Sequence, residues 1–267
     1  MILASASPTS LALTLATALA YAVPAVASSR LSGHASRNVI LLAWLLHAVL
    51  LSLGLLGETP RFGFAPALSV TAWLVAAVYT VESHVYPQLQ TRWALSALGA
   101  AAVLLAEVFP GNPLHATASP WLPLHWALGI ASYGLFAAAA THAWFMNRTE
   151  DRIRLAADSY SGLPLLTIER LTFRFVEAGF VLLSATLLVG ILFGESLYGR
   201  GVAWKWDHKT VFSLLSWLTF AVLLIGRARF GWRGRRAASI LYMGSVLLLL
   251  AYVGSRFVLE IILGRSA

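Results

Sequence analysis

Long, uninterrupted apolar runs constrain this chain more than any other feature of its sequence. Each run is roughly twenty residues long, enough for a helix with 1.5 Å of rise per residue to cross a hydrocarbon core of about 30 Å. The runs cover residues 9–27, 39–56, 66–86, 93–109, 121–146, 171–193, 210–225 and 237–262. Transmembrane β-strands are shorter and alternate in polarity, so these runs predict helices. We therefore expect an all-α polytopic transmembrane helix bundle of about eight helices.

Composition excludes a soluble fold and narrows the cofactor chemistry. Hydrophobic residues make up 59% of the chain and charged residues 11%, against roughly 45–50% and about 25% in soluble domains. The formal charge of +8 does not indicate a nucleic-acid partner, because the arginines stand between apolar runs and not on one face. The chain has no cysteine, so histidine becomes the principal candidate ligand for any metal or cofactor.

Arginine placement predicts the orientation of the helices. Connections after the first, third, fifth and seventh run contain most of the arginines, including the stretch 227–236, while the opposite connections contain few. The positive-inside rule then places both termini outside the cytoplasm. We expect one integral membrane domain over residues 1–267, with five helices at 9–146, a cytoplasmic linker at 147–170 and three helices at 171–262. The run 227–236 is dense enough in cations to favour anionic membrane lipids as partners.

The first run also has features of a secretory signal. Ala25, Val26 and Ala27, followed by Ser28, resemble a small-residue cleavage site. No basic residue precedes the apolar run, however, as it usually would in a signal peptide. We therefore expect an uncleaved helix in a multi-pass protein of the bacterial inner membrane.

The connection before the seventh run has an unusual combination of side chains. It contains Trp204, Lys205, Trp206, Asp207, His208 and Lys209. Flat aromatic faces, an imidazole and cations are what a haem requires for its ring, its iron and its propionates. The alternative is an aromatic belt, since tryptophan and lysine also gather at membrane interfaces without any ligand.

The other histidines fall into two groups by depth. His125 lies at the outer end of the fifth run, on the same side as His208, and the two are candidate axial ligands of one haem iron. His47 lies near the middle of the second run, while His84 and His142 lie towards the cytoplasmic ends of their helices. His125 and His142 are about 25 Å apart along one helix, so they cannot bind the same iron. A second haem site or a role in helix packing are both open for the inner histidines. Arg174 and Glu177, three residues apart in the sixth run, predict an ion pair.

Several motifs resemble those of a known family. They are the stretch 121–125 with Trp121 and His125, Ser132 and Tyr133 after it, and the Trp204-Lys205-Trp206-Asp207 run. On these residues the chain resembles the cytochrome c assembly membrane-protein superfamily of CcsA, ResC and CcmC. Four other stretches are most similar to the YpjD and HemX-type subgroup, namely residues 43–47, 208–217, 231–236 and 252–256. The resemblance implies that His125 is an outer haem ligand and that residues 204–207 form a platform for the ring, next to Trp121.

Some features depart from that family. The resemblance to a haem-handling CcsA implies a histidine where this chain has Ile225-Gly226 and another where it has Gly264-Arg265, and the tryptophan-rich segment is shorter here. We therefore do not expect complete cytochrome c haem ligation by this chain alone. The expected function is transient binding and handling of haem b in cytochrome c biogenesis or haem homeostasis, without enzymatic activity and with other cytochrome c assembly proteins as partners. The alternatives are a divalent metal-ion efflux component and a regulatory membrane partner without haem.

Overall fold

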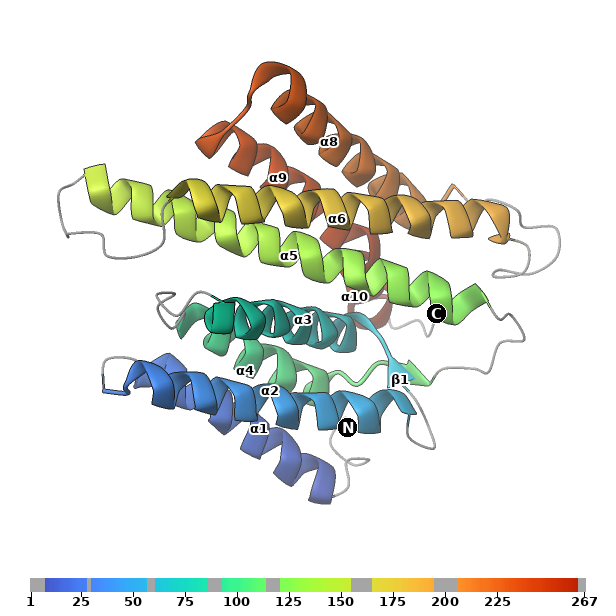
Figure 1. Ribbon diagram of the computed structural model, residues 1–267. Coiled ribbons are helices and arrows are strands. Elements are labelled where there is room, and N and C mark those ends of the chain that lie inside the picture. Colours follow the sequence, from blue (N-terminus) through green and yellow to red (C-terminus); the bar gives the residue numbers. More distant parts are fainter. Residues whose placement is uncertain are drawn as a thin grey trace. The chain divides into compact units, whose positions relative to one another are not determined.

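The computed structural model describes residues 8–27, 30–56, 61–85, 93–113, 121–154, 165–194 and 206–263. The long helices in these ranges are α1 (Pro8–Val26), α2 (Gly33–Leu56), α3 (Phe64–Val85), α4 (Trp93–Val108), α5 (Trp121–Arg154), α6 (Leu165–Leu192), α8 (His208–Phe230) and α9 (Gly234–Leu249). The last of them continues through the π-helix η1 (Leu250–Gly254), α10 (Ser255–Phe257) and the π-helix η2 (Val258–Ile262) (Figure 1). Strands β1 (Arg61–Phe62) and β2 (Asn112–Pro113) pair antiparallel.

Helix lengths confirm the predicted fold class. Within the described part of the chain, seven helical stretches are long and apolar enough to cross a membrane, counting Gly234–Ile262 as one. The remaining predicted helix, α4, is also present and apolar, but it has 16 residues. The chain is therefore an all-α, polytopic membrane protein.

Two compact units make up the chain, and among the described residues each has four long helices. The first contains Met1–His115 together with Arg256–Ala267, and the second contains Ala116–Ser255. In the first unit α1 packs on α2, α2 on α3, α3 on α4 and α4 again on α1. In the second unit α5, α6, α8 and α9 close a ring in the same way. The division falls before α5, whereas the sequence grouped α5 with the preceding helices, because α5 packs on α6 and α9.

Close packing and polar contacts join the helices of the first unit. Tyr21 of α1 is 1% exposed and lies over Gly99 of α4, where an added methyl group would come within 2.9 Å of its ring. Nearer the start of α1, Thr14 Oγ1 donates a hydrogen bond of 2.7 Å to Glu107 Oε2 of α4. Van der Waals packing through small residues and interhelical hydrogen bonds are the main forces that hold helices together in lipid.

Residues from the end of the chain complete this first unit. The ring of Phe257 packs at 5.4 Å and 87° against Phe64, at the start of α3. Glu260 lies against Gly63, where an added methyl group would be 2.9 Å from Oε2. Gly63 also lies against Gly111, which adopts φ 79. The close approach of the chain next to the paired strands β1 and β2 therefore requires residues without a side chain. Segments almost two hundred residues apart in sequence therefore meet at the start of α3.

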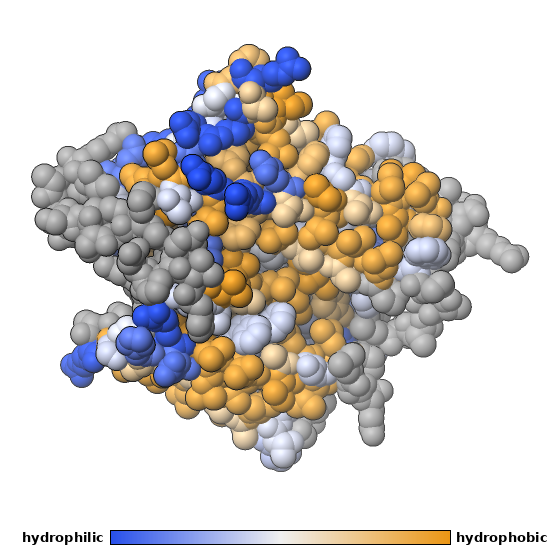
Figure 2. Space-filling view, in the orientation of Figure 1, coloured by the Kyte–Doolittle hydropathy of each residue, from blue (hydrophilic) through white to orange (hydrophobic). Residues whose placement is uncertain are grey.

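Stacked aromatic rings form the core of the second unit. Phe136 of α5 and Phe220 of α8 stack at 3.7 Å with their planes 2° apart. Gly179 of α6 and Gly244 of α9 make room for these rings, since a methyl group at either position would approach a ring within 3.1 Å or less. On the outside, the large apolar residues of both units are exposed, as expected for surfaces that face lipid (Figure 2).

The π-helical turns of the last helix coincide with side chains that bond its backbone. A π-helix shifts the hydrogen-bond pattern by one residue, which leaves backbone carbonyls in need of other donors. Tyr133 of α5 donates its hydroxyl proton to the carbonyl of Leu248, two residues before η1. Ser255, directly after η1, donates to the carbonyls of Leu250 and Ala251 at 3.1 and 3.0 Å.

Helices α5 and α6 extend into the segment that the sequence assigned to a cytoplasmic linker. Helix α5 continues beyond Met146 to Arg154, and α6 begins at Leu165. The extension of α5 carries charged residues, and one of them, Asp151, is ion-paired with Arg235 at the start of α9. Helical hydrogen bonding therefore continues past the apolar run, where water can solvate the side chains.

Candidate functional site

His125 lies on the second turn of α5, and its ring faces α6. The ring lies beside the backbone at Thr186 and Gly190, where an added methyl group on Gly190 would be 3.5 Å from Cε1. Nδ1 of His125 is buried without a hydrogen-bond partner, while the ring interacts with the backbone of Thr186. Most buried polar atoms in proteins are hydrogen-bonded, so this nitrogen is available to a ligand.

A flat aromatic surface lies one helical turn before His125. The indole of Trp121 stacks on the ring of Phe193, directly after α6, at 4.0 Å and 12°. Trp121 is 38% exposed, so the side of the indole that Phe193 does not cover is accessible. Residues 121 and 125 are four apart on one helix and therefore lie on one face. The predicted site residues Trp121 and His125 are thus neighbours at one end of α5.

The first turn of α8 holds the described part of the tryptophan-rich segment. Asp207 is the N-cap, and its Oδ1 accepts a 2.9 Å hydrogen bond from the backbone N–H of Thr210. Trp206 is 75% exposed, His208 is exposed, and Lys209 is half-buried. Asp207 therefore has a structural role that the sequence did not predict.

The structure does not describe two of the predicted site residues in the tryptophan-rich segment. Trp204 and Lys205 lie outside the described residues.

Contacts with α6 show where His125 and His208 lie along the length of that helix. Trp217 of α8 donates from Nε1 to Ser184 Oγ of α6 at 2.8 Å, and its ring stacks on Phe180. Helix α8 starts nine residues before Trp217, and α6 ends eight residues after Ser184. The start of α8, with His208, therefore lies level with the end of α6. His125 lies beside that same end of α6, at Gly190. The contacts described for His125 and His208 include no ring contact or hydrogen bond between the two. Shared ligation by these histidines stays a prediction.

Both ring nitrogens of His47 are occupied by neighbouring helices. Nδ1 lies 3.3 Å from the hydroxyl of Tyr21 on α1, and Nε2 lies 2.8 Å from Oγ of Ser69 on α3. His47 is 0% exposed, and beside it Trp44 stacks on Trp73 at 5.1 Å. This arrangement is that of a helix-packing histidine, one of the two roles that the sequence left open.

The other two inner histidines belong to different units. His142 of α5 is 4% exposed and its ring packs at 5.4 Å against Phe175 of α6. His84 lies near the end of α3, and its side chain is outside the described part of the structure. Their predicted role as partners of His47 in a second site stays untested.

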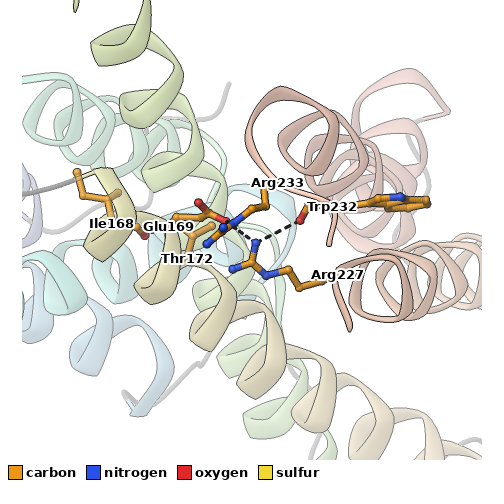
Figure 3. A network of polar contacts seen from close by, with 6 residues as sticks. All are labelled: Ile168, Glu169, Thr172, Arg227, Trp232 and Arg233. Atoms are coloured by element: carbon orange, nitrogen blue, oxygen red, sulfur yellow. Dashed lines mark hydrogen bonds and ion pairs between the residues drawn. The ribbon is translucent and has the colours of Figure 1, made fainter. Parts of the chain in front are cut away.

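A buried carboxylate that the sequence did not single out lies at the other end of the second unit. Glu169 of α6 accepts hydrogen bonds on Oε1 from Nη1 of Arg227 and from Nε of Arg233, the latter at 3.0 Å (Figure 3). The pair predicted instead, Arg174 and Glu177, is not joined: both side chains are exposed on α6, and neither is among the ion pairs of the described residues. The apolar run starts after Glu169, and the sequence therefore placed this residue in a linker.

Among the described residues, His125 is suited to act as one ligand of a haem iron. Among them, no group of three or more His, Asp or Glu side chains is placed to hold a bare metal ion. His125 provides a buried nitrogen without a partner, and its ring lies beside Gly190 of α6, which has no side chain. Haem iron needs an imidazole and an apolar, partly aromatic surrounding, both of which exist at this end of α5.

Comparison with known proteins gives several relatives. The chain is 34% identical over 163 residues to the inner membrane protein YpjD of Escherichia coli K12, an alignment that covers 59% of this chain and 60% of that protein. It is 31% identical over 210 residues to a 28.8 kDa protein of Azospirillum brasilense, covering 74% and 76%. The cytochrome c biogenesis protein CcsA of Prochlorococcus marinus is 26% identical over 180 residues, or 66% of this chain and 54% of that protein. No solved structure matches.

A family model gives the most extensive match. The model described as cytochrome C assembly protein covers residues 32–263, which include almost all of the described helices. Together with the membrane-length helices and the inner-membrane relative, this match identifies a multi-pass protein of the bacterial inner membrane. The chain belongs to the cytochrome c assembly protein family.

Proposed function

We propose that this protein binds haem b transiently at the end of α5 that carries His125, and that it handles haem for cytochrome c biogenesis without catalysing a reaction itself. Membership of the cytochrome c assembly family supports the biological role. The relatives named CcsA are cytochrome c biogenesis proteins, and the alignments cover only part of them. The proposal for this chain therefore depends on its own residues.

The observation that carries the proposal is the buried Nδ1 of His125 without a hydrogen bond. Leaving a buried polar atom unpaired costs about 1–3 kcal/mol, and a ligand bound to this nitrogen would remove that cost. Gly190 keeps the neighbouring surface of α6 free of a side chain. The ring already lies beside α6 before a ligand arrives, so part of the ordering cost of binding is met by the fold.

Residues around His125 have separate roles in this proposal. Trp121, held by its stacking on Phe193, offers its uncovered face to the edge of the macrocycle. Asp207 fixes the start of α8 through its cap, and this cap positions His208 and Lys209. His208 is the proposed second imidazole, and the ammonium group of Lys209 is suited to a propionate. When bound, haem would supply an iron that the imidazoles of His125 and His208 would hold.

Haem content, measured from the visible spectrum of protein purified from haem-replete cells, tests the proposal. We expect a Soret band in the wild type that is lost or strongly reduced in His125→Gly. Free imidazole added to His125→Gly should restore the band, because the small ligand can occupy the space of the missing ring. His34→Ala is the matched control, since His34 is exposed at the start of α2 and belongs to the other unit.

Two outcomes would contradict the proposal. One is a wild-type protein that is colourless and does not bind added haem. The other is a His125→Gly protein that keeps the full haem content and the unchanged spectrum of the wild type. An unchanged elution volume in detergent shows that the His125→Gly protein is folded and makes the second result decisive.

A further inference from the structure

The connection between α8 and α9 gathers more positive than negative charge around one buried carboxylate. Oε1 of Glu169, whose side chain is 10% exposed, accepts from both Arg227 and Arg233 (Figure 3). Two guanidinium groups share one carboxylate, so this cluster keeps a net charge of +1. Arginine does not lose its proton in proteins, and the excess charge is therefore permanent.

The same cluster holds the connection in one conformation. Arg227 also donates to the backbone carbonyl of Trp232 at 3.3 Å and lies 4.3 Å from the ring centre of Phe173. Gly231 ends α8 with φ 63, and the N–H of Trp232 bonds back to the carbonyl of Gly226 at 3.2 Å. A turn fixed in this way loses little conformational entropy when it binds a partner.

Exposed cations and aromatic rings cover the outside of this turn. Arg229, Arg233 and Arg236 are exposed, and the guanidinium group of Arg236 lies 4.2 Å over the ring of Trp232. Phe230 is 72% exposed and lies beside Trp232, with 6.2 Å between ring centres. Arg235 differs from its neighbours because it is paired with Asp151. In the described part of the chain, neither Arg229 nor Arg236 is ion-paired with a carboxylate.

The apolar flank of α8 indicates where the α8–α9 turn lies relative to the membrane. The flank of α8 just before the turn is apolar and outward-facing, with Val222 50% and Ile225 57% exposed. Figure 2 shows the hydrophilic residues of this region beside a hydrophobic surface. An exposed apolar flank belongs in hydrocarbon, so the turn that follows it lies at the level of the lipid headgroups. Aromatic rings with one polar edge prefer the same level.

We propose that the α8–α9 turn is a binding site for the phosphodiester group of an anionic phospholipid, held by Arg229, Arg233 and Arg236, with Phe230 and Trp232 at the headgroup level. Guanidinium groups bind phosphate oxygens in pairs and lose hydration more easily than ammonium groups. With Arg235 paired to Asp151, the cluster and turn hold four cations and one carboxylate, an excess of positive charge that an anion complements. The site is independent of haem binding.

Native mass spectrometry of delipidated protein tests the site with phosphatidylglycerol as the probe and phosphatidylcholine as the neutral lipid. We compare wild type with the double variant Arg229→Gln/Arg236→Gln. Each cation near a membrane surface contributes about 1 kcal/mol to the binding of anionic lipid, so losing two should weaken phosphatidylglycerol binding about 30-fold. Phosphatidylcholine should bind weakly and equally to both proteins.

Arg30→Gln provides the matched control, because Arg30 is an exposed arginine between α1 and α2. It should bind phosphatidylglycerol as the wild type does. Equal binding by wild type and the double variant would overturn the proposal. So would full displacement of phosphatidylglycerol by millimolar inorganic phosphate, which would show a simple anion site. Both substituted side chains are exposed, and an unchanged melting temperature without lipid confirms that the double variant is folded.

Discussion

The hydroxyl group of Tyr21 lies 3.3 Å from Nδ1 of His47, and this contact joins α1 to α2 inside the first unit. Because Nε2 of the same ring meets Ser69 of α3, one imidazole links three helices. Hydrogen bonds of this kind contribute about 0.6–2 kcal/mol each in a membrane protein. His47 thus has two packing partners, whereas His125 has a buried nitrogen without one.

Replacing His47 should therefore affect stability and leave haem content unchanged. We expect His47→Ala to lower the free energy of unfolding by about 2 kcal/mol or more, since it removes two hydrogen bonds and leaves a cavity. Thermal melting in detergent measures the first effect, and the haem-to-protein ratio measures the second. A haem content that falls as far in His47→Ala as in His125→Ala would instead support a second site that includes His84 or His142.

His125 and His208 should both affect the haem spectrum if they share one iron. Removing either imidazole opens an axial position, so His125→Ala and His208→Ala should each reduce haem content or change the spin state. Reduced-minus-oxidised spectra measure the change. If His208→Ala keeps the wild-type spectrum while His125→Ala does not, another group provides the second ligand.

Membrane orientation follows from the arginines and can be read with reporter fusions. A fusion after Gly201 should report the outer side, and a fusion after Arg233 should report the cytoplasm. Activity of a phosphatase and of a fluorescent protein, each folding on one side only, distinguishes the two. If both positions report the same side, the number of membrane crossings between them is not the single one expected for α8.

Gly226 is a position where one added methyl group should be costly. It would lie 2.1 Å from Cε3 of Trp232, whose N–H is bonded to the carbonyl of Gly226. We expect Gly226→Ala to lower the free energy of unfolding by about 1–3 kcal/mol, the usual cost of overpacking. The control is Gly54→Ala in α2, with no atom within 4 Å of an added methyl group. That change should be neutral or stabilising, and a loss in Gly54→Ala equal to that in Gly226→Ala would contradict this explanation.

The cap at the start of α8 provides a test that separates fold from ligand. Asp207→Ala removes the acceptor for the N–H of Thr210 and should cost about 1 kcal/mol. Asp207→Ser keeps a capping oxygen without the charge, so it should retain most of the stability. Melting of the two variants compares these effects. If Asp207→Ser is as unstable as Asp207→Ala, the charge of Asp207 matters more than its hydrogen bond.

Apolar runs predicted the helices well because lipid requires every backbone group to be bonded within its own segment. The start of α4 was placed at Trp93, where the structure has it. Ends of helices outside the hydrocarbon were less accurate, as the extension of α5 to Arg154 shows, since charged residues in water can continue a helix without an apolar signal.

Side-chain partners across helices were much harder to predict. No pattern within α2 indicates that His47 meets Tyr21 and Ser69, because those residues depend on how three helices are rotated about their axes. Likewise, Glu169 is bonded by residues 58 and 64 positions later in the chain. Sequence spacing suggested Arg174 and Glu177 instead, although a spacing of three only makes an ion pair possible.

The contact of Phe257 and Glu260 with the start of α3 has a consequence for biosynthesis. A ribosome makes residues 1–115 first and residues 256–263 only after all of the second unit. Helices α1 to α4 therefore enter the membrane long before the segment that packs against the start of α3 exists. Order of synthesis and order of assembly differ in this protein, and the first unit to be inserted is the last to be finished.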